Sequence, residues 1–114
     1  MVDWVKAREF GDILYEKAEG VAKITINRPE KRNAFRAKTF SEMSQAFLDA
    51  WADHNVGVVV LTGAGDRAFC SGGDVSERGA TGYGGEERGA ALGFSIPTPY
   101  ELIRRIPKVV IAMV

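Results

Sequence analysis

The sequence predicts an α/β fold in which strands and helices alternate along one small domain. One observation is a change of hydrophobic period, from the alternation typical of strands in residues 12–27 to the three- and four-residue spacing of a helix in residues 39–54. The other is a pair of nearly all-apolar, β-branched runs at 56–61 and 108–114, which are typical of strands in parallel sheets. The length of 114 residues suits one small domain or part of a larger one.

The first elements expected are two antiparallel strands joined as a hairpin. Asp12–Lys17 and Val21–Asn27 both alternate apolar and polar side chains, and the short segment Ala18-Glu19-Gly20 between them is typical of a turn. Pro29 should end the second strand, because proline cannot donate a hydrogen bond to a sheet ladder.

A helix follows the hairpin. Thr39 is expected at its N-cap and Glu42 three residues later, as in a capping box, and the helix should end near His54-Asn55. Its apolar face should comprise Phe40, Met43, Phe47 and Trp51. The run 56–61 should then form a strand covered on both faces.

Most of the 13 glycines lie between Gly63 and Gly93, a density that favours backbone lying close to a ligand, or a loop. A second helix should begin with Thr98 as N-cap, Pro99 at its first position and Glu101 completing a capping box. Lys108–Val114 should be a second buried strand, parallel to the first and reached by a right-handed crossover. Because the sequence stops inside this strand, we expect residues 1–114 to be the N-terminal part of a domain truncated near 108–114.

Composition excludes several classes of function. Lys plus Arg and Asp plus Glu both number 15, so no overall field attracts nucleic acid or an anionic membrane. The N-terminus has no apolar signal-peptide region, so we expect a cytoplasmic protein. A lone His54 and a lone Cys70 cannot form a zinc site or an internal disulfide.

Two conventional motifs fit poorly. The run Gly63-Ala64-Gly65 through Ala68 has the spacing of a dinucleotide-binding loop, but no helical period follows it. Cys70 or Ser71 could be a nucleophile only with a base within hydrogen-bond reach, and His54 is expected at the end of the first helix. A small buried apolar residue is the simpler interpretation of Cys70.

The pair Gly72-Gly73 and the cations before the first helix allow two interpretations each. The glycines are either a plain turn or backbone N–H donors aimed at a developing oxyanion, with Asp74 opening a helix behind them. The cations are either solvated or hold a phosphate; they are Arg28, Lys31, Arg32 and Arg36.

Three ordered stretches resemble the crotonase (enoyl-CoA hydratase/isomerase) superfamily. They are Ile24 to Ala34 (ITINRPEKRNA), Leu61 to Asp74 (LTGAGDRAFCSGGD) and Pro107 to Val114 (PKVVIAMV). The resemblance implies the N-terminal portion of a crotonase-like ββα spiral that acts on coenzyme A thioesters. It also implies an oxyanion role for the glycine pair and a coenzyme A contact for the cationic loop.

Carried over by position, the resemblance assigns a set of site residues. Arg32 would bind coenzyme A, Ser71 and Gly72 would hold its adenine and pantetheine portions through backbone groups, and the Gly73 N–H would donate to the thioester oxygen. The resemblance also implies substrate contacts further along the chain: Asp74 and Val75, Arg78 in a loop over the substrate, and Tyr83 as an active-site tyrosine.

The family's chemistry is the stabilisation of a thioester enolate. Within the family, the residues around Asn33–Arg36 and Arg78 resemble the branch that closes a ring by a Claisen-type condensation in menaquinone biosynthesis. A ring-opening hydrolase, another hydratase or isomerase, and an inactive acyl-CoA-binding fragment are the alternatives. The resemblance implies an acyl-CoA substrate and no tightly bound cofactor or metal. It places the second oxyanion donor and the base, a carboxylate or a bound bicarbonate, after Val114, and implies a homotrimer or hexamer for the full-length enzyme.

Overall fold

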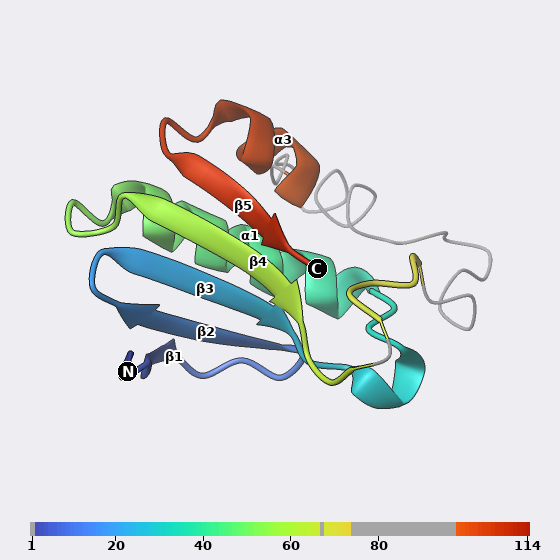
Figure 1. The fold of residues 1–114 in the computed structure, drawn as a ribbon. Coiled ribbons are helices and arrows are strands. Elements are labelled where there is room, and N and C mark those ends of the chain that lie inside the picture. Colours follow the sequence, from blue (N-terminus) through green and yellow to red (C-terminus); the bar gives the residue numbers. More distant parts are fainter. Residues whose placement is uncertain (1, 67, 74–97) are drawn as a thin grey trace.

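The computed structural model describes residues 2–66, 68–73 and 98–114. Within them five strands form one sheet in the order β1-β2-β3-β4-β5, with α1 lying against one face and α3 beside β5 (Figure 1). The strands are β1 Val5–Arg8, β2 Ile13–Ala18, β3 Val21–Ile26, β4 Val58–Gly63 and β5 Val109–Met113. The helices are the 3₁₀ turn η1 Pro29–Lys31, α1 Ala37–Ala52 and α3 Pro99–Arg105. The predicted α/β class is confirmed.

The predicted hairpin is present. β2 and β3 are antiparallel and close with Ala18 paired to Val21. The two residues between them, Glu19 and Gly20, have φ angles of 50° and 82°. Positive φ at both loop positions gives a turn that matches the right-handed twist of the strands, and glycine adopts it without strain.

The edge strand β1 was not expected from the sequence. It pairs antiparallel with β2 through an irregularity between Lys6 and Arg8, and all four of its residues are exposed. A four-residue strand with no buried side chain leaves almost no hydrophobic signal, so backbone pairing alone reveals it.

The two remaining strand pairs are parallel. β3 pairs with β4, with Ile26 opposite Gly63, and β4 pairs with β5, with Leu61 opposite Ala112. The predicted parallel pairing of the two apolar strands is therefore confirmed. The handedness of the predicted crossover stays a prediction, because part of the segment between β4 and β5 lies outside the described residues.

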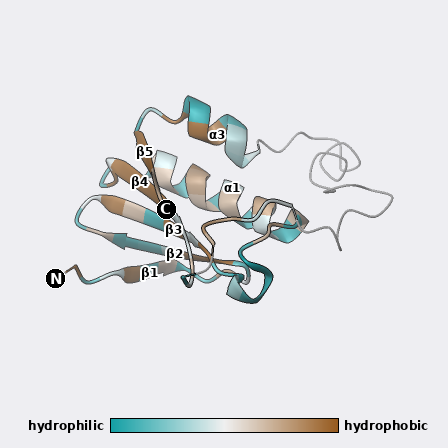
Figure 2. Cartoon of the chain, turned by 45° about the vertical axis from the view of Figure 1, so that its right-hand side comes forward, coloured by the Kyte–Doolittle hydropathy of each residue, from teal (hydrophilic) through white to brown (hydrophobic). Residues whose placement is uncertain are grey.

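The prediction that both apolar strands are covered on both faces is wrong for the described structure. In β4 only alternate residues, Val59 and Leu61, are buried. In the edge strand β5, Val109, Ile111 and Met113 are 59%, 48% and 51% exposed. The described helices leave one face of the sheet uncovered, although hydrophobic residues colour β4 and β5 strongly (Figure 2). The composition of these strands indicated that they are apolar, but it could not indicate whether other elements cover the second face of the sheet.

The start of α1 also differs from the prediction. The helix begins at Ala37 with Arg36 as N-cap, so Thr39 lies at the third helical position instead of the cap. Thr39 Oγ1 accepts from the Arg36 N–H at 3.1 Å and donates to Asp12 Oδ2 at 2.7 Å. Glu42 accepts from the backbone N–H groups of Gly11 and Asp12, at 2.9 and 2.6 Å. Thr39 therefore caps α1 from the third helical position, as the side-chain acceptor of a capping box, and both polar side chains also join α1 to the start of β2.

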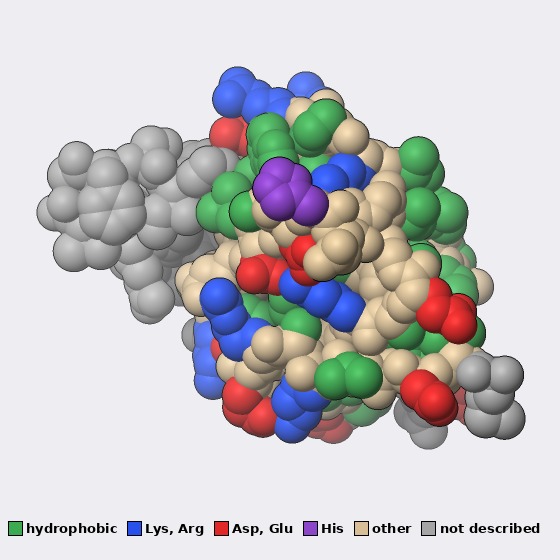
Figure 3. All heavy atoms as spheres, turned by 90° about the vertical axis from the view of Figure 1, so that its left-hand side faces the viewer, with side chains coloured by type: hydrophobic (Ala, Val, Ile, Leu, Met, Phe, Trp, Pro, Cys, Tyr) green, Lys and Arg blue, Asp and Glu red, His purple; other side chains and the backbone are tan. Residues whose placement is uncertain are grey.

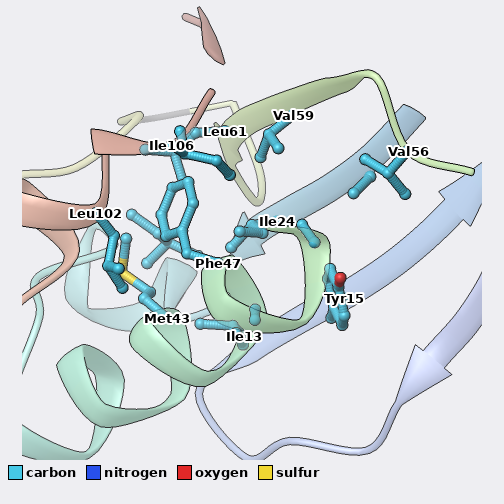
Figure 4. Packing of buried hydrophobic residues seen from close by; sticks show 14 residues of the cluster. Ile13, Tyr15, Ile24, Met43, Phe47, Val56, Val59, Leu61, Leu102 and Ile106 are labelled. Atoms are coloured by element: carbon cyan, nitrogen blue, oxygen red, sulfur yellow. The ribbon is translucent and has the colours of Figure 1, made fainter. Parts of the chain in front are cut away.

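The core lies between α1, α3 and one face of the sheet (Figure 4). Met43 and Phe47 are buried as predicted, whereas Trp51 is 37% exposed. Ala46 and Ala50 are fully buried, and such small side chains allow a helix to lie close to the strands. The remaining cluster members come from the strands, α3 and the segments beside them: Ile13, Tyr15, Ala22, Ile24, Ile26, Val56, Val59, Leu61, Leu102 and Ile106.

The cap of α3 is confirmed, with Thr98 Oγ1 accepting from the Glu101 N–H at 3.3 Å and Pro99 in the first turn. In the described part of the chain no helix is both long enough and apolar enough to cross a membrane.

Candidate functional site

Two loops meet at one edge of the sheet, to the right in Figure 1. The β3 loop comprises residues 27–36 and the β4 loop residues 64–73, of which residue 67 is not described. Because β3 and β4 are parallel, both loops leave the carboxyl ends of their strands at the same edge. In α/β proteins this is the edge at which ligands bind.

The β3 loop folds tightly on itself. The N–H groups of Lys31 and Asn33 both donate to the Arg28 carbonyl, at 2.9 and 2.8 Å. Arg32 and Asn33 follow η1 with φ angles of 52° and 58°, in the left-handed region. Asparagine tolerates this region far better than arginine does. The loop is therefore a fixed turn that reverses the chain before α1.

The four cations of the β3 loop divide into two pairs. Arg28 is only 7% exposed and donates to the Ala34 carbonyl at 2.6 Å, and Arg36 forms a two-point ion pair with Asp12, with both N–O distances 2.8 Å. Lys31 and Arg32 are exposed. Of the four, only these two therefore present their side chains openly to solvent.

The ion pair of Asp12 and Arg36 fixes the base of the β3 loop. Hydrogen bonding from Arg36, and then from Thr39, lowers the pKa of the Asp12 carboxyl to about 2, against the opposing effect of burial. Asp12 thus stays ionised and joins the start of β2 to the residue that caps α1.

Asn33 joins the two loops, a role that the sequence did not reveal. Its side chain is fully buried, Oδ1 accepts from the Arg28 N–H at 3.0 Å, and Nδ2 donates to the carbonyls of Ala64 at 2.9 Å and Ala68 at 2.6 Å. The only signal in the sequence was an asparagine beside a proline turn, which many surface loops share.

The glycine pair lies directly against the β3 loop. The Ser71 N–H donates to the Arg32 carbonyl at 3.2 Å, and the Phe35 N–H donates to the Gly72 carbonyl at 2.9 Å. Gly72 has a φ of 102°, which a residue with a Cβ adopts only with strain. The structure therefore brings together four of the predicted site residues: Arg32, Ser71, Gly72 and Gly73.

The pairing of Phe35 with Gly73 determines the direction of one N–H group. The two residues form an isolated parallel bridge in which the Gly72 carbonyl faces Phe35. The Gly72 C=O and the Gly73 N–H belong to one trans peptide group, in which these two bonds point in opposite directions. The Gly73 N–H therefore points away from the β3 loop, and among the described residues no group accepts from it. Such a donor can meet an external acceptor.

The remaining predicted site residues, Asp74, Val75, Arg78 and Tyr83, lie outside the described residues. The dinucleotide-binding alternative gains no support, because residues 64–66 and 68–73 contain no helix. His54 lies just before β4, whereas Cys70 and Ser71 follow its far end. A six-residue strand separates the two ends by roughly 20 Å, so His54 cannot be the base for either side chain.

A small cavity of about 130 Å³ lies between the two loops. It is lined by Pro29, Arg32, Asn33, Ala64, Gly65, Asp66 and Ala68. A more open hollow of about 380 Å³ adjoins it, sharing Gly65, Asp66 and Ala68 and reaching Met113 at the end of β5. The loops therefore enclose a recess beside an exposed cation.

The opposite edge of the sheet carries a second group of charges, in which acidic and basic side chains are intermixed (Figure 3). Lys17 lies 2.7 Å from both Asp49 and Asp53, and the Tyr15 hydroxyl donates to Asp49 at 2.6 Å. Burial, and then the hydrogen bond to Asp49, raises the pKa of the Tyr15 hydroxyl. These contacts fasten β2 to the last turns of α1. The described residues contain no group of three potential metal ligands.

Comparison with known proteins agrees with this geometry. Residues 16–114 match the family model described as enoyl-CoA hydratase/isomerase. The chain is similar to an enoyl-CoA hydratase/carnithine racemase from Magnetospirillum magneticum, with 29% identity and a TM-score of 0.75, over 91% of this chain and 39% of that one.

Two further solved structures are described as enoyl-CoA hydratase/isomerases. One, from Mycobacterium paratuberculosis, is 32% identical with a TM-score of 0.70, over 91% of this chain and 40% of that one. The other, from Xanthobacter autotrophicus Py2, is 34% identical with a TM-score of 0.68, over 93% and 39%. The chain thus spans about two fifths of the length of these three proteins.

Proposed function

Because the chain belongs to the enoyl-CoA hydratase/isomerase family, we propose that its Gly73 N–H is one donor of an oxyanion hole for the thioester carbonyl of an acyl-coenzyme A. The observation that carries the proposal is the direction of this N–H, which points away from the β3 loop and meets no acceptor among the described residues. A backbone donor held in advance at the position where negative charge develops lowers the barrier without reorganisation.

The reaction class follows from the same donor. Removing a proton next to a thioester carbonyl, or making or breaking a carbon–carbon bond there, places negative charge on the carbonyl oxygen. A hydrogen bond to that oxygen is stronger in the enolate than in the ground state, so it accelerates the step. The family's hydratase, isomerase and carbon–carbon bond reactions all share this demand.

The coenzyme A portion would lie along the two loops. Arg32 is exposed beside the cavity and offers a cation to a phosphate. Ser71 and Gly72 would bind the adenine and pantetheine portions through backbone groups, as the family motif implies. Asp74, Val75, Arg78 and Tyr83 would complete the substrate site.

For the substrate we propose o-succinylbenzoyl-CoA, the substrate of 1,4-dihydroxy-2-naphthoyl-CoA synthase in menaquinone biosynthesis. The support is the likeness of Asn33-Ala34-Phe35-Arg36 and Arg78-Gly79 to that enzyme's motifs. The enzyme would close a ring by attack of an enolate carbon on a carboxyl carbon, with loss of water. A second donor and a base, either a carboxylate or a bound bicarbonate, would complete the site in a cytoplasmic trimer or hexamer.

An enoyl-CoA hydratase or isomerase is the second candidate, favoured by the descriptions of the three similar structures. A ring-opening hydrolase of 2-ketocyclohexanecarboxyl-CoA would use the same donor in the reverse sense. An inactive acyl-CoA-binding protein is the non-enzymatic alternative. Assays of the intact protein with o-succinylbenzoyl-CoA, 2-ketocyclohexanecarboxyl-CoA and crotonyl-CoA separate these candidates, and binding without turnover of any of them would favour the last.

Gly73→Pro tests the oxyanion donor, because proline has no N–H. One such donor is worth roughly 3–4 kcal/mol, so we expect kcat of the intact protein to fall at least ~100-fold. Gly73→Ala is the matched control, since it changes the same residue and keeps the N–H, and its loss should be much smaller. Equal turnover of the proline variant and the wild type, both correctly folded, would refute the assignment.

A further inference from the structure

We propose that Asn33 is a positioning residue that holds the Gly73 N–H in place by clamping the β4 loop to the β3 loop. The inference rests on the proposed role of Gly73 and adds a residue that makes no contact with the reacting atoms. It follows from four hydrogen bonds that residues 32–35 exchange with the β4 loop.

The first two bonds come from the Asn33 amide. Both Nδ2 hydrogens are used, one on the Ala64 carbonyl and one on the Ala68 carbonyl, while Oδ1 accepts from Arg28 within the β3 loop. The side chain is fully buried. If the Nδ2 donors were removed by mutation, water could reach the two carbonyls only if the β3 and β4 loops moved apart. Asn33 thus spans both ends of the turn that follows β4.

The other two bonds connect the β3 loop to the segment that contains Gly72 and Gly73. Arg32 accepts from Ser71, and Phe35 donates to the Gly72 carbonyl. Gly73 is five residues after Ala68 and is held against Phe35 by the bridge that sets the direction of its N–H. Without the Asn33 amide, Ala64 would still be held by its N–H donating to the Ile26 carbonyl at 2.8 Å, but the segment between Ala64 and Ser71 would be free to shift. A displacement of about 1 Å at a reacting centre can cost about 100-fold in rate.

Asparagine is suited to this position for two reasons. Its φ of 58° is tolerated by asparagine, aspartate and glycine better than by other residues. Among those three, only asparagine offers two N–H donors beside an acceptor. The packing is also close, since a Cβ on Gly63 would lie 2.7 Å from Asn33 Nδ2.

Asn33→Asp separates positioning from binding. Aspartate keeps an oxygen for the Arg28 N–H, so the β3 loop and its exposed Arg32 should retain their shape. It removes both Nδ2 donors and places a carboxylate against two carbonyl oxygens. In the intact protein we expect kcat to fall about 10- to 100-fold, with the dissociation constant for free coenzyme A, measured by calorimetry, within about threefold of wild type.

Two further variants control for charge and folding. Asn33→Gly permits the same φ and removes the amide without adding a charge, and it should show the same division between kcat and binding. Asn55→Asp adds the same charge at an exposed asparagine near the opposite edge of the sheet, and it should leave both quantities unchanged.

A vibrational measurement distinguishes failure of this inference from failure of the proposed function. A carbonyl polarised by N–H donors absorbs at lower frequency, so we would record the ¹³C=O stretch of a bound, labelled acyl-CoA. A downshift in the wild type that shrinks in Asn33→Asp and Asn33→Gly supports the clamp. A downshift that both variants retain, with kcat within threefold of wild type, overturns the clamp and leaves Gly73 as donor. Absence of any downshift in the wild type overturns the proposed oxyanion role itself. Equal loss of coenzyme A binding and of kcat would show a merely structural role and also overturn the clamp.

Discussion

A methyl group added at Gly63 should separate the two loops of the site. Gly63 is the last residue of β4 and lies beneath the contact between Asn33 and the β4 loop. A Cβ built there would overlap the Phe69 carbonyl oxygen and lie 2.8 Å from its carbon and 2.7 Å from Asn33 Nδ2. Because Phe69 contributes backbone atoms, the overlap cannot be relieved by rotating a side chain, so the β4 loop itself must move.

The expected change in the free energy of unfolding combines two destabilising effects and one stabilising effect. Overpacking costs about 1–3 kcal/mol, and leaving the buried Asn33 partners unsatisfied costs about 1–3 kcal/mol. Replacing glycine by alanine recovers roughly 0.4–1 kcal/mol through the unfolded chain. We therefore expect Gly63→Ala to lower the free energy of unfolding of the intact protein by about 1–6 kcal/mol, with a central value of about 3 kcal/mol.

Gly57→Ala is the matched control. Nothing lies within 4 Å of a Cβ at Gly57, and its φ is not positive, so this variant should be unchanged or more stable by up to about 1 kcal/mol. Urea denaturation of both variants measures the difference, and amide hydrogen exchange at Ser71 and Phe35 should show faster exchange in Gly63→Ala only. If the free energies of unfolding of Gly63→Ala and Gly57→Ala differed by less than about 0.5 kcal/mol, the close packing of Gly63 against Phe69 and Asn33 would be refuted.

Two further variants test the supports of α1. The pKa of Asp12 is depressed to about 2 in the folded protein. The ionised Asp12 therefore stabilises the folded state above about pH 4, and this contribution is lost as the pH falls through 2. The contribution to the free energy of unfolding is about 2 kcal/mol. Asp12→Asn should remove that part of the acid dependence in pH-dependent urea titrations, and an unchanged slope between pH 4 and 2 would contradict the ion pair. Lys108 donates to two carbonyls at the end of α1, at 2.5 and 2.6 Å, so Lys108→Met should lower the melting temperature and cost about 1–3 kcal/mol. Lys6→Met, at an exposed ion pair, should leave the melting temperature nearly unchanged, and similar losses in both lysine variants would contradict the capping role.

The sequence predicted the elements whose signals are local. The β2–β3 hairpin needs only alternation and a glycine at a positive φ, and the cap of α3 needs only Thr98 and Pro99 at neighbouring positions. The parallel β4–β5 pair followed from two apolar runs separated by a helix. Three motifs in the right order likewise predicted the family, which the match over residues 16–114 shows.

The tertiary structure determined how those elements use their polar residues. Thr39 and Glu42 have the spacing of a helix cap, yet both turn to the start of β2, because a buried carboxylate and two backbone N–H groups there require partners. Asn33 is indistinguishable in sequence from a surface asparagine, and only the parallel register of β3 and β4 brings it within reach of Ala64 and Ala68. The glycine pair could be recognised from sequence as a possible oxyanion site. The direction of the Gly73 N–H depends on the long-range pairing with Phe35, since a backbone donor is aimed by the strand beside it and not by its own residue type.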